Sequence, residues 1–143
     1  MKRKLEPLVA IRWAVGIVFI TEGVLKYLHP EDIGAGRFAR IGLPMPATLA
    51  PVVCGVEILC GLALLVNLAP DYAAMALLCV IASALVTTKV PVLLGRQMGP
   101  FTLMKAPYYG VLGFLHEARL DLSMFACLVA IIWRHWEIGK ELE

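Results

Sequence analysis

The strongest constraint in this sequence is a series of long apolar segments, each close to the length that a helix needs to cross a lipid bilayer. A helical span takes about 20 mostly apolar residues, so a chain of 143 residues can hold at most four or five. The chain is 60% hydrophobic, which excludes a soluble globular enzyme domain and a disordered tail. Its 13 basic and 11 acidic side chains nearly balance, which argues against binding to nucleic acid.

Four segments are predicted to span the membrane, at about residues 8–28, 47–68, 72–94 and 119–136. Pro70 separates the second span from the third, and Pro91 is expected to kink or stop the third. Between the third and fourth spans, residues 95–115 mix prolines with aromatic side chains, and this pattern predicts a broken interfacial or re-entrant segment. The predicted fold is one all-α domain, an integral membrane four-helix bundle over residues 1–143.

The distribution of basic residues predicts the orientation of the bundle. Lys2, Arg3 and Lys4 precede the first span, and loops rich in lysine and arginine stay on the cytoplasmic side. With four spans, the second terminus returns to the same side. We therefore expect a multi-pass protein of a cell (inner) membrane with both termini in the cytoplasm.

Charged side chains within or beside the spans carry most of the functional information. There are three acids and three bases, so their charges cancel: Glu22, Lys26, Glu57, Lys89, Arg119 and Asp121. Threading the spans up and down brings all of them except Glu57 to one side, and Glu57 falls near the midplane. An ionised group at a helix centre costs roughly 2.5–3.5 kcal/mol. These side chains must therefore pair or face a water-filled cavity, and with His116 they are the candidate ligand or proton-relay residues.

A purely structural interpretation stays open for several of these charges. Glu22 and Lys26 are one helical turn apart and can pair within the first span. Lys89 and Arg119 are near enough to span ends to reach the headgroups, and Asp121 could stabilise a helix N-terminus. Arg119 and Asp121 point to different sides of their helix, so at least one of them needs a partner elsewhere or faces headgroups.

Histidines and cysteines give no sign of a cofactor. His29 and His116 both flank spans and His135 lies at the opposite end, so a bis-histidine haem is not expected. No tight metal-binding spacing occurs, and no metal is predicted, although His116, Glu117 and Asp121 could form either a solvated cap or a small metal or proton-relay site. The four cysteines lie in apolar stretches without a C-x-x-C motif and are interpreted as packing thiols.

Three motifs follow one another in the first two thirds of the chain. The first span ends in Gly23-Val-Leu-Lys26, the loop after it ends in Ile41-Gly-Leu-Pro44, and the second span is centred on Glu57-Ile-Leu-Cys-Gly-Leu62. In this order and spacing they resemble the DoxX family of small four-span membrane proteins. The resemblance covers about residues 8–95, and the last third of the chain fits in outline only.

The resemblance implies a membrane subunit tied to quinone-linked redox chemistry, as in thiosulfate:quinone oxidoreductase or terminal quinol oxidase assemblies. Lys26 and Glu57 match the family pattern best. In this hypothesis Lys26 or Lys89 donates to a quinone carbonyl, and Glu57 and Glu22 accept or relay protons. The sequence contains no haem, flavin or iron–sulfur motif, so no intrinsic cofactor is expected and a partner redox protein is implied.

Two other classes of function remain open from the sequence. The chain could be a non-catalytic membrane scaffold or assembly factor, in which the polar cluster serves helix packing and partner docking. It could also be a small transporter or channel subunit. The latter requires a homo-oligomer, because four helices enclose little volume.

Overall fold

The computed structural model describes residues 6–142, and this part of the chain is helical apart from its turns and loops and one isolated bridge between Met98 and Phe101. A π-helical turn, η2 (Leu85–Lys89), joins two of the α-helices without interruption. The α-helices are α1 (Glu6–Leu28), α2 (Ala35–Ile41), α3 (Pro46–Val66), α4 (Pro70–Ala84), α5 (Val90–Leu94) and α6 (Gly110–Glu141). The predicted all-α class is therefore correct.

Prolines mark the helix starts that the sequence predicted. α3 begins at Pro46 and α4 begins at Pro70, because proline lacks the N–H that the first helical position leaves unpaired in any case. α3 ends at Val66, and the residue that caps it, Asn67, has a φ of 59°, in the left-handed region. This residue turns the chain back so that α4 runs antiparallel to α3.

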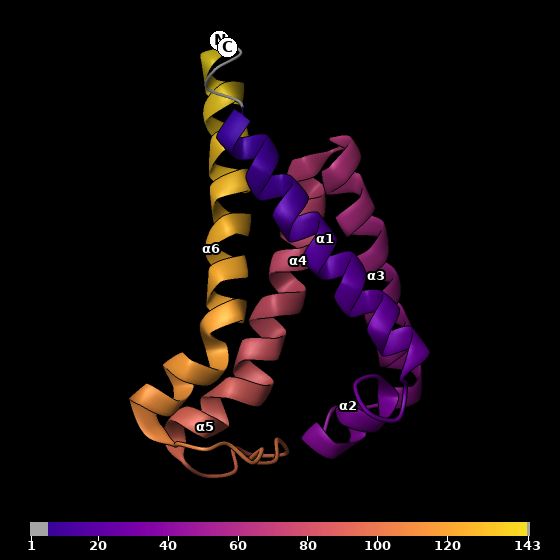
Figure 1. The fold of residues 1–143 in the computed structure, drawn as a ribbon, viewed down its shortest axis with the longest axis vertical. Helices are drawn as coiled ribbons and strands as arrows, with labels where there is room; N and C mark the ends of the chain where they lie inside the picture. Colours follow the sequence, from indigo (N-terminus) through magenta and orange to yellow (C-terminus); the bar gives the residue numbers. More distant parts are fainter. Residues whose placement is uncertain (1–5, 143) are drawn as a thin grey trace.

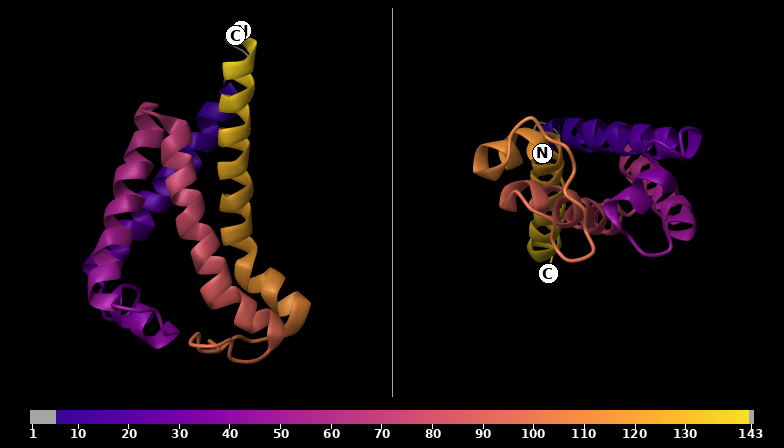
Figure 2. Two further views of the ribbon diagram at one scale, coloured as in Figure 1. Left: turned by 180° about the vertical axis from the view of Figure 1, so that it is seen from behind. Right: turned by 90° about the horizontal axis from the view of Figure 1, so that it is seen from below.

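The helices form two packed pairs (Figure 1). α1 crosses α3 at an angle, and α6 lies along α4, with α3 and α4 joining the two pairs. The start of α1 and the end of α6 lie at the same end of the molecule, while α2 and the segment between α5 and α6 lie at the other end (Figures 1 and 2). Lys2, Arg3 and Lys4, on which the predicted orientation rests, lie outside the described residues.

A single apolar core holds the two pairs together. It draws on α1, α3, α4 and α6, and its fully buried members come from all four helices. They are Val15, Leu64, Ala74, Leu77 and Leu128. Many other large apolar side chains on the long helices, such as Ile17 and Leu59, are exposed, as expected for surfaces that contact lipid rather than water.

The predicted count of four membrane spans is not exact. By length and composition three helical stretches can cross a membrane in the described part of the chain: Pro7–Leu28, Pro46–Val66 and Pro70–Leu94. The predicted fourth span lies inside α6, which is the longest helix but also the least apolar of the four long ones. Charged residues at both ends of the predicted fourth span lower its hydropathy, and this is why it is not among the three candidate spans.

The predicted broken segment is also shorter than expected. Between α5 and α6 the chain is non-helical only over residues 95–109, and α6 begins at Gly110 rather than near residue 119. Prolines stop at Pro107, and the following residues have no feature that prevents a helix. The loop returns to α2, where the Thr102 N–H donates to the Ile41 carbonyl at 3.1 Å and the Thr102 hydroxyl donates to the Arg40 carbonyl. The short helix α2 was not predicted.

Two glycines allow α1 and α3 to approach closely. A Cβ atom at Gly61 would lie 2.9 Å from the Gly16 carbonyl oxygen and 2.7 Å from Ile20 Cγ1. A Cβ atom at Gly16 would lie 2.8 Å from the Gly61 carbonyl oxygen. Small residues at such a crossing let helix backbones pack directly in a membrane. Gly55, on the same helix, has nothing within 4 Å of its Cβ position.

We predict that Gly61→Ala destabilises the protein by about 1–3 kcal/mol, because the added methyl group would force α1 away from α3. The matched control is Gly55→Ala, which meets open space and should stabilise the protein by up to about 1 kcal/mol through helix propensity. Unfolding in mild detergent with increasing SDS measures both. Equal effects of the two substitutions would contradict the close contact.

Candidate functional site

A buried ion pair joins α1 to α3. Lys26 Nζ lies 2.9 Å from both carboxylate oxygens of Glu57 and 3.4 Å from Glu22 Oε2. The Glu57 side chain is only 4% exposed and that of Lys26 14%, whereas Glu22 is 47% exposed. Lys26 therefore has Glu57 as its main partner, and the Glu22 contact expected from the sequence is the longer and more solvated one.

The ion pair depends on a third close approach between the same helices. Gly23 lies one turn before Lys26, and a Cβ atom there would come within 3.2 Å of Glu57 Cβ and 3.0 Å of the Cys54 carbonyl oxygen. The missing side chain lets the backbone of α1 lie against α3 at the level of Glu57. Lys26 can then reach the carboxylate from the next turn.

A second ion pair joins η2 to α6. Lys89 Nζ lies 3.7 Å from Asp121 Oδ2, with side chains that are 15% and 26% exposed. The distance is longer than a hydrogen bond. Within residues 6–142, the Lys89 ammonium group makes no hydrogen bond within 3.5 Å, in contrast to that of Lys26.

The two ion pairs belong to one charged end of the molecule. The Asp121 carboxylate is within electrostatic range of Glu22 on α1 and of Arg37 on α2, as well as of Lys89. We define the charged end by its six side chains: Glu22, Lys26, Arg37, Glu57, Lys89 and Asp121. Glu22 and Lys26 are in the last two turns of α1, Arg37 is in α2 and Lys89 is in η2, segments at the end of the bundle where α2 and the loop between α5 and α6 lie (Figure 1). Glu57 lies near the middle of α3, and the six charges sum to zero.

Two candidate residues do not join the charged end. Arg119 is exposed, and its guanidinium group donates to the backbone carbonyl of His116. The imidazole of His116 is exposed and packs edge-on against Tyr108 at 6.5 Å between ring centroids. No group of three potential ligands that includes His116, Glu117 or Asp121 is placed to hold a metal ion in the part of the chain described.

Sequence reasoning missed Arg37. Arg37 is the third basic residue of the charged end, where the sequence had predicted Arg119. Arg37 lies in α2, a helix that was not predicted. Phe38 and Ile41 are both buried, and their three-residue spacing is the available signal that this stretch is an amphipathic helix. A helix there places Arg37 on a defined side of the molecule.

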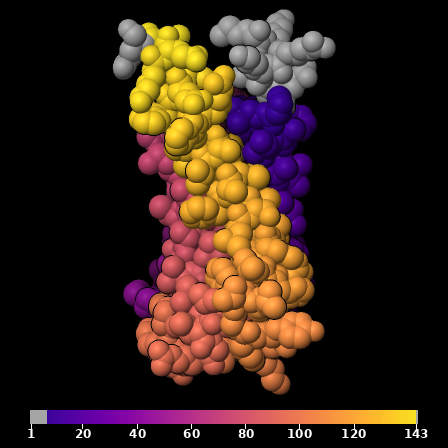
Figure 3. All heavy atoms as spheres, turned by 90° about the vertical axis from the view of Figure 1, so that its left-hand side faces the viewer, coloured from indigo at the N-terminus to yellow at the C-terminus, as the bar shows by residue number. Residues whose placement is uncertain are grey.

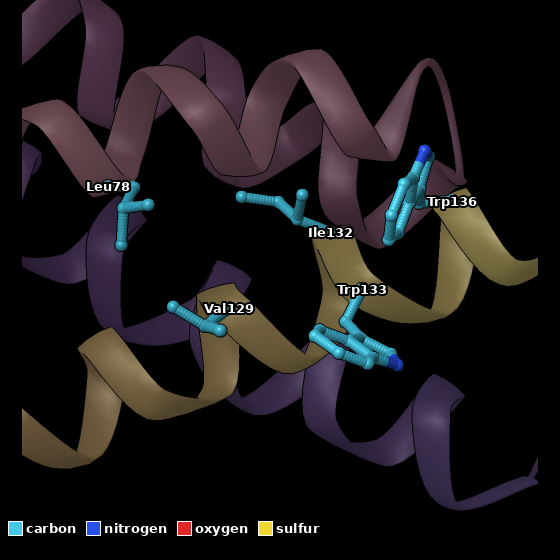
Figure 4. Close-up of a pocket in the computed structure, with 5 residues that line it drawn as sticks. All are labelled: Leu78, Val129, Ile132, Trp133 and Trp136. Carbon is cyan, nitrogen blue, oxygen red and sulfur yellow. The ribbon is translucent and has the colours of Figure 1, made fainter.

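The opposite end of the bundle carries a different surface. A shallow groove of about 240 Å³ runs between α4 and α6, and five apolar side chains line it: Leu78, Val129, Ile132, Trp133 and Trp136 (Figure 4). Figure 3 shows α6 and α4 side by side. Trp133 Nε1 donates to Glu137 at 2.8 Å, and Lys140 Nζ lies 3.6 Å from the centre of the Trp136 ring. Indole rings held this way match the aromatic belt of a membrane interface.

The fold and the charged end define a class, namely small helical integral membrane proteins with ion pairs buried between the spans. The sequence model of the DoxX family matches residues 8–90, more than half of the chain, and the protein belongs to the DoxX family. It is similar to the uncharacterized membrane protein Rv3486 of Mycobacterium tuberculosis, with 37% identity over 137 residues that cover 94% of this chain and 80% of the relative. No solved structure matches the chain.

We predict that Glu57→Gln destabilises the protein by about 3–5 kcal/mol, because it leaves the ammonium group of Lys26 buried without a full counter-charge. Glu22→Gln is the matched control on the same lysine. Since Glu22 is half exposed, its loss should cost less than about 1 kcal/mol. Unfolding midpoints in mild detergent compare the two variants.

A double variant separates lost charge compensation from lost packing. Lys26→Met with Glu57→Met removes both charges and keeps similar side-chain volumes, so its stability should return to near that of the wild type. A double variant as unstable as Glu57→Gln would show that the charges themselves do not account for the loss.

Proposed function

We propose that this protein is a membrane subunit of, or a partner to, a quinone-linked oxidoreductase, and that its charged end binds a quinone or a similar small amphipathic molecule. The observation that carries the proposal is that the ammonium group of Lys89 is partly buried and has no hydrogen-bond acceptor within 3.5 Å among residues 6–142. This group is 15% exposed and 3.7 Å from Asp121, beyond hydrogen-bond distance. A lysine ammonium has three donors, and within residues 6–142 no protein acceptor lies within 3.5 Å of those of Lys89. A ligand carbonyl oxygen is the acceptor that such a group favours.

Of the two lysines that the sequence offered for this role, Lys89 is the better supported. The donors of Lys26 are directed at oxygens of Glu57 and Glu22. A carbonyl could replace only the longer contact to Glu22 without breaking the buried pair. Lys89 can donate to a carbonyl oxygen without giving up any hydrogen bond to residues 6–142.

The neighbouring acid gives this site a means of proton transfer. Full reduction of a quinone adds two electrons and two protons and converts both carbonyl oxygens to hydroxyls. In the proposal, Lys89 holds one carbonyl oxygen, and Asp121, which is 26% exposed, passes protons between that oxygen and the water at the charged end. The electrons come from a redox cofactor of the partner protein.

A second candidate function, a non-catalytic scaffold, is favoured by the Lys26–Glu57 pair. The two side chains are buried and 2.9 Å apart, and they hydrogen-bond to each other. Such a pair is better suited to holding α1 against α3, as a lock between the two helices, than to binding a ligand. A scaffold would use the charged end only to fix the shape that a partner recognises. The two proposals differ in whether Lys89 has a ligand.

We predict that a short-tailed naphthoquinone raises the unfolding temperature of the protein in lipid nanodiscs, because a ligand of the folded state stabilises it by about 2.7 kcal/mol at a concentration of 100 Kd. Lys89→Met should abolish this shift. Lys105→Met, on the exposed loop between α5 and α6, is the matched control and should retain it.

The lipid extract of gently purified protein provides an independent measurement. The proposal predicts quinone in the extract of the wild type and of Lys105→Met but not of Lys89→Met. If quinone is missing from the wild-type extract and leaves its unfolding temperature unchanged, the quinone proposal is wrong. A pull-down in mild detergent with Glu57→Gln then tests the scaffold, which should lose its partner when the lock is broken.

A further inference from the structure

We infer that Pro91 is a positioning residue for this site, because it imposes the π-helical turn that aims Lys89 at Asp121. The role of the site as a ligand site rests on the proposed function. The geometric part, from Pro91 through η2 to Lys89, does not depend on any ligand. It begins with the chemistry of proline within a helix.

Proline cannot continue an α-helix without a local change. It has no N–H to donate, and its ring clashes with the carbonyl group four residues earlier, which here belongs to Thr87. The helix could break or kink, but instead it widens. The Val90 N–H donates to the carbonyl of Leu85, five residues back instead of four. The Pro91 side chain is fully buried, so packing keeps the ring in place.

Two threonines stabilise the widened turn. The Thr87 hydroxyl donates to the Ser83 carbonyl at 2.8 Å, and the Thr88 hydroxyl donates to the Ala84 carbonyl at 2.6 Å. Both residues are buried. The hydroxyl groups thus give hydrogen bonds to carbonyls of the preceding turn, where the backbone register changes and water is excluded.

The π-helical turn determines where Lys89 points. It contains one residue more than an α-helical turn, and each residue of an α-helix advances by about 100°. Relaxation to a regular α-helix would therefore rotate Lys89 and the residues after it by up to about 100° relative to α4. Lys89 is the last residue of the turn and faces α6 through its 3.7 Å contact with Asp121. If the turn became α-helical with the same number of residues, the ammonium group would leave this partner.

A zero-length cross-link tests the geometry directly. A membrane-permeant carbodiimide activates a carboxyl group, a nearby lysine amine displaces the activated oxygen, and an amide forms as the reagent leaves as a urea. Mass spectrometry then detects two peptides joined with the net loss of one water. In the wild-type protein in nanodiscs we expect links between Lys89 and Asp121 and between Lys26 and Glu57.

Pro91→Ala should lower the Lys89–Asp121 cross-link at least tenfold and leave the Lys26–Glu57 cross-link, the internal control, unchanged. It should also weaken the binding of the naphthoquinone by at least tenfold. An unchanged Lys89–Asp121 cross-link in this variant would overturn the inference.

A compensating deletion distinguishes positioning from general damage. Removing Val86, which is 49% exposed, from the Pro91→Ala variant takes out the extra residue and restores the register of Lys89 in a regular α-helix. This double variant should recover the Lys89–Asp121 cross-link. If it does not, the inference is wrong, even where Pro91→Ala alone proves too unstable to analyse. If the cross-links behave as expected but quinone does not bind the wild type, the positioning stands and the proposed function fails.

Discussion

The close packing of α1 against α3 around the buried Lys26–Glu57 ion pair is the constraint on which the arrangement of the helices depends. A buried charge is tolerated only when its partner is close and well oriented, because removing an ion from water costs several kcal/mol even after the protein relaxes. The 2.9 Å contacts therefore fix both the depth and the rotation of α1 against α3. Glycines at the same interface make this possible, since any side chain at Gly23 would hold the two helices apart.

The remaining charges are arranged around this fixed pair. α4 continues the hairpin that begins with α3, and its π-helical extension presents Lys89 to α6. Asp121 pairs with Lys89. It also interacts electrostatically with Glu22 on α1 and Arg37 on α2. Each pair of helices thus contributes one ion pair, and the loop held by Thr102 connects the two sides at the charged end. The proposed function depends on the difference between the two pairs. Lys26 donates hydrogen bonds to Glu57, whereas Lys89 lies beyond hydrogen-bond distance of Asp121 and is left to bind a ligand.

The sequence predicted the parts of the fold that depend on apolar length and proline. The bounds of α1 and α3 and the start of α4 follow from these features, and so does the grouping of Glu22, Lys26, Lys89 and Asp121 at one end. Hydropathy could not show that α6 starts at Gly110, because His116, Glu117 and Arg119 separate its apolar first turns from the rest of the helix. Nor could residue periodicity show the π-helical turn, which differs from a kink at Pro91 only by one residue of register.

For Lys26, the sequence predicted the partner that is nearer along the chain, Glu22, whereas the partner that is nearer in space is Glu57. Glu22 is one turn from Lys26 and pairs with it in any helix, whereas Glu57 is 31 residues away and becomes a partner only once α1 and α3 are packed. Arg119 was expected among the charges of the bundle, and Arg37 was not, because the direction of a side chain follows from the packing of helices that the sequence alone does not determine.

The two partners of Lys26 have a consequence for the synthesis of the protein. The chain enters the membrane from its N-terminal side, so α1 is complete before Glu57 has been made. Glu22 precedes Lys26 by one turn and can neutralise it within α1 alone. When α3 follows, the lysine can exchange this solvated partner for the buried one and keep the first as a weaker third contact. Glu22 therefore offers Lys26 a counter-charge within α1 alone, before the packing of α3 supplies the buried one.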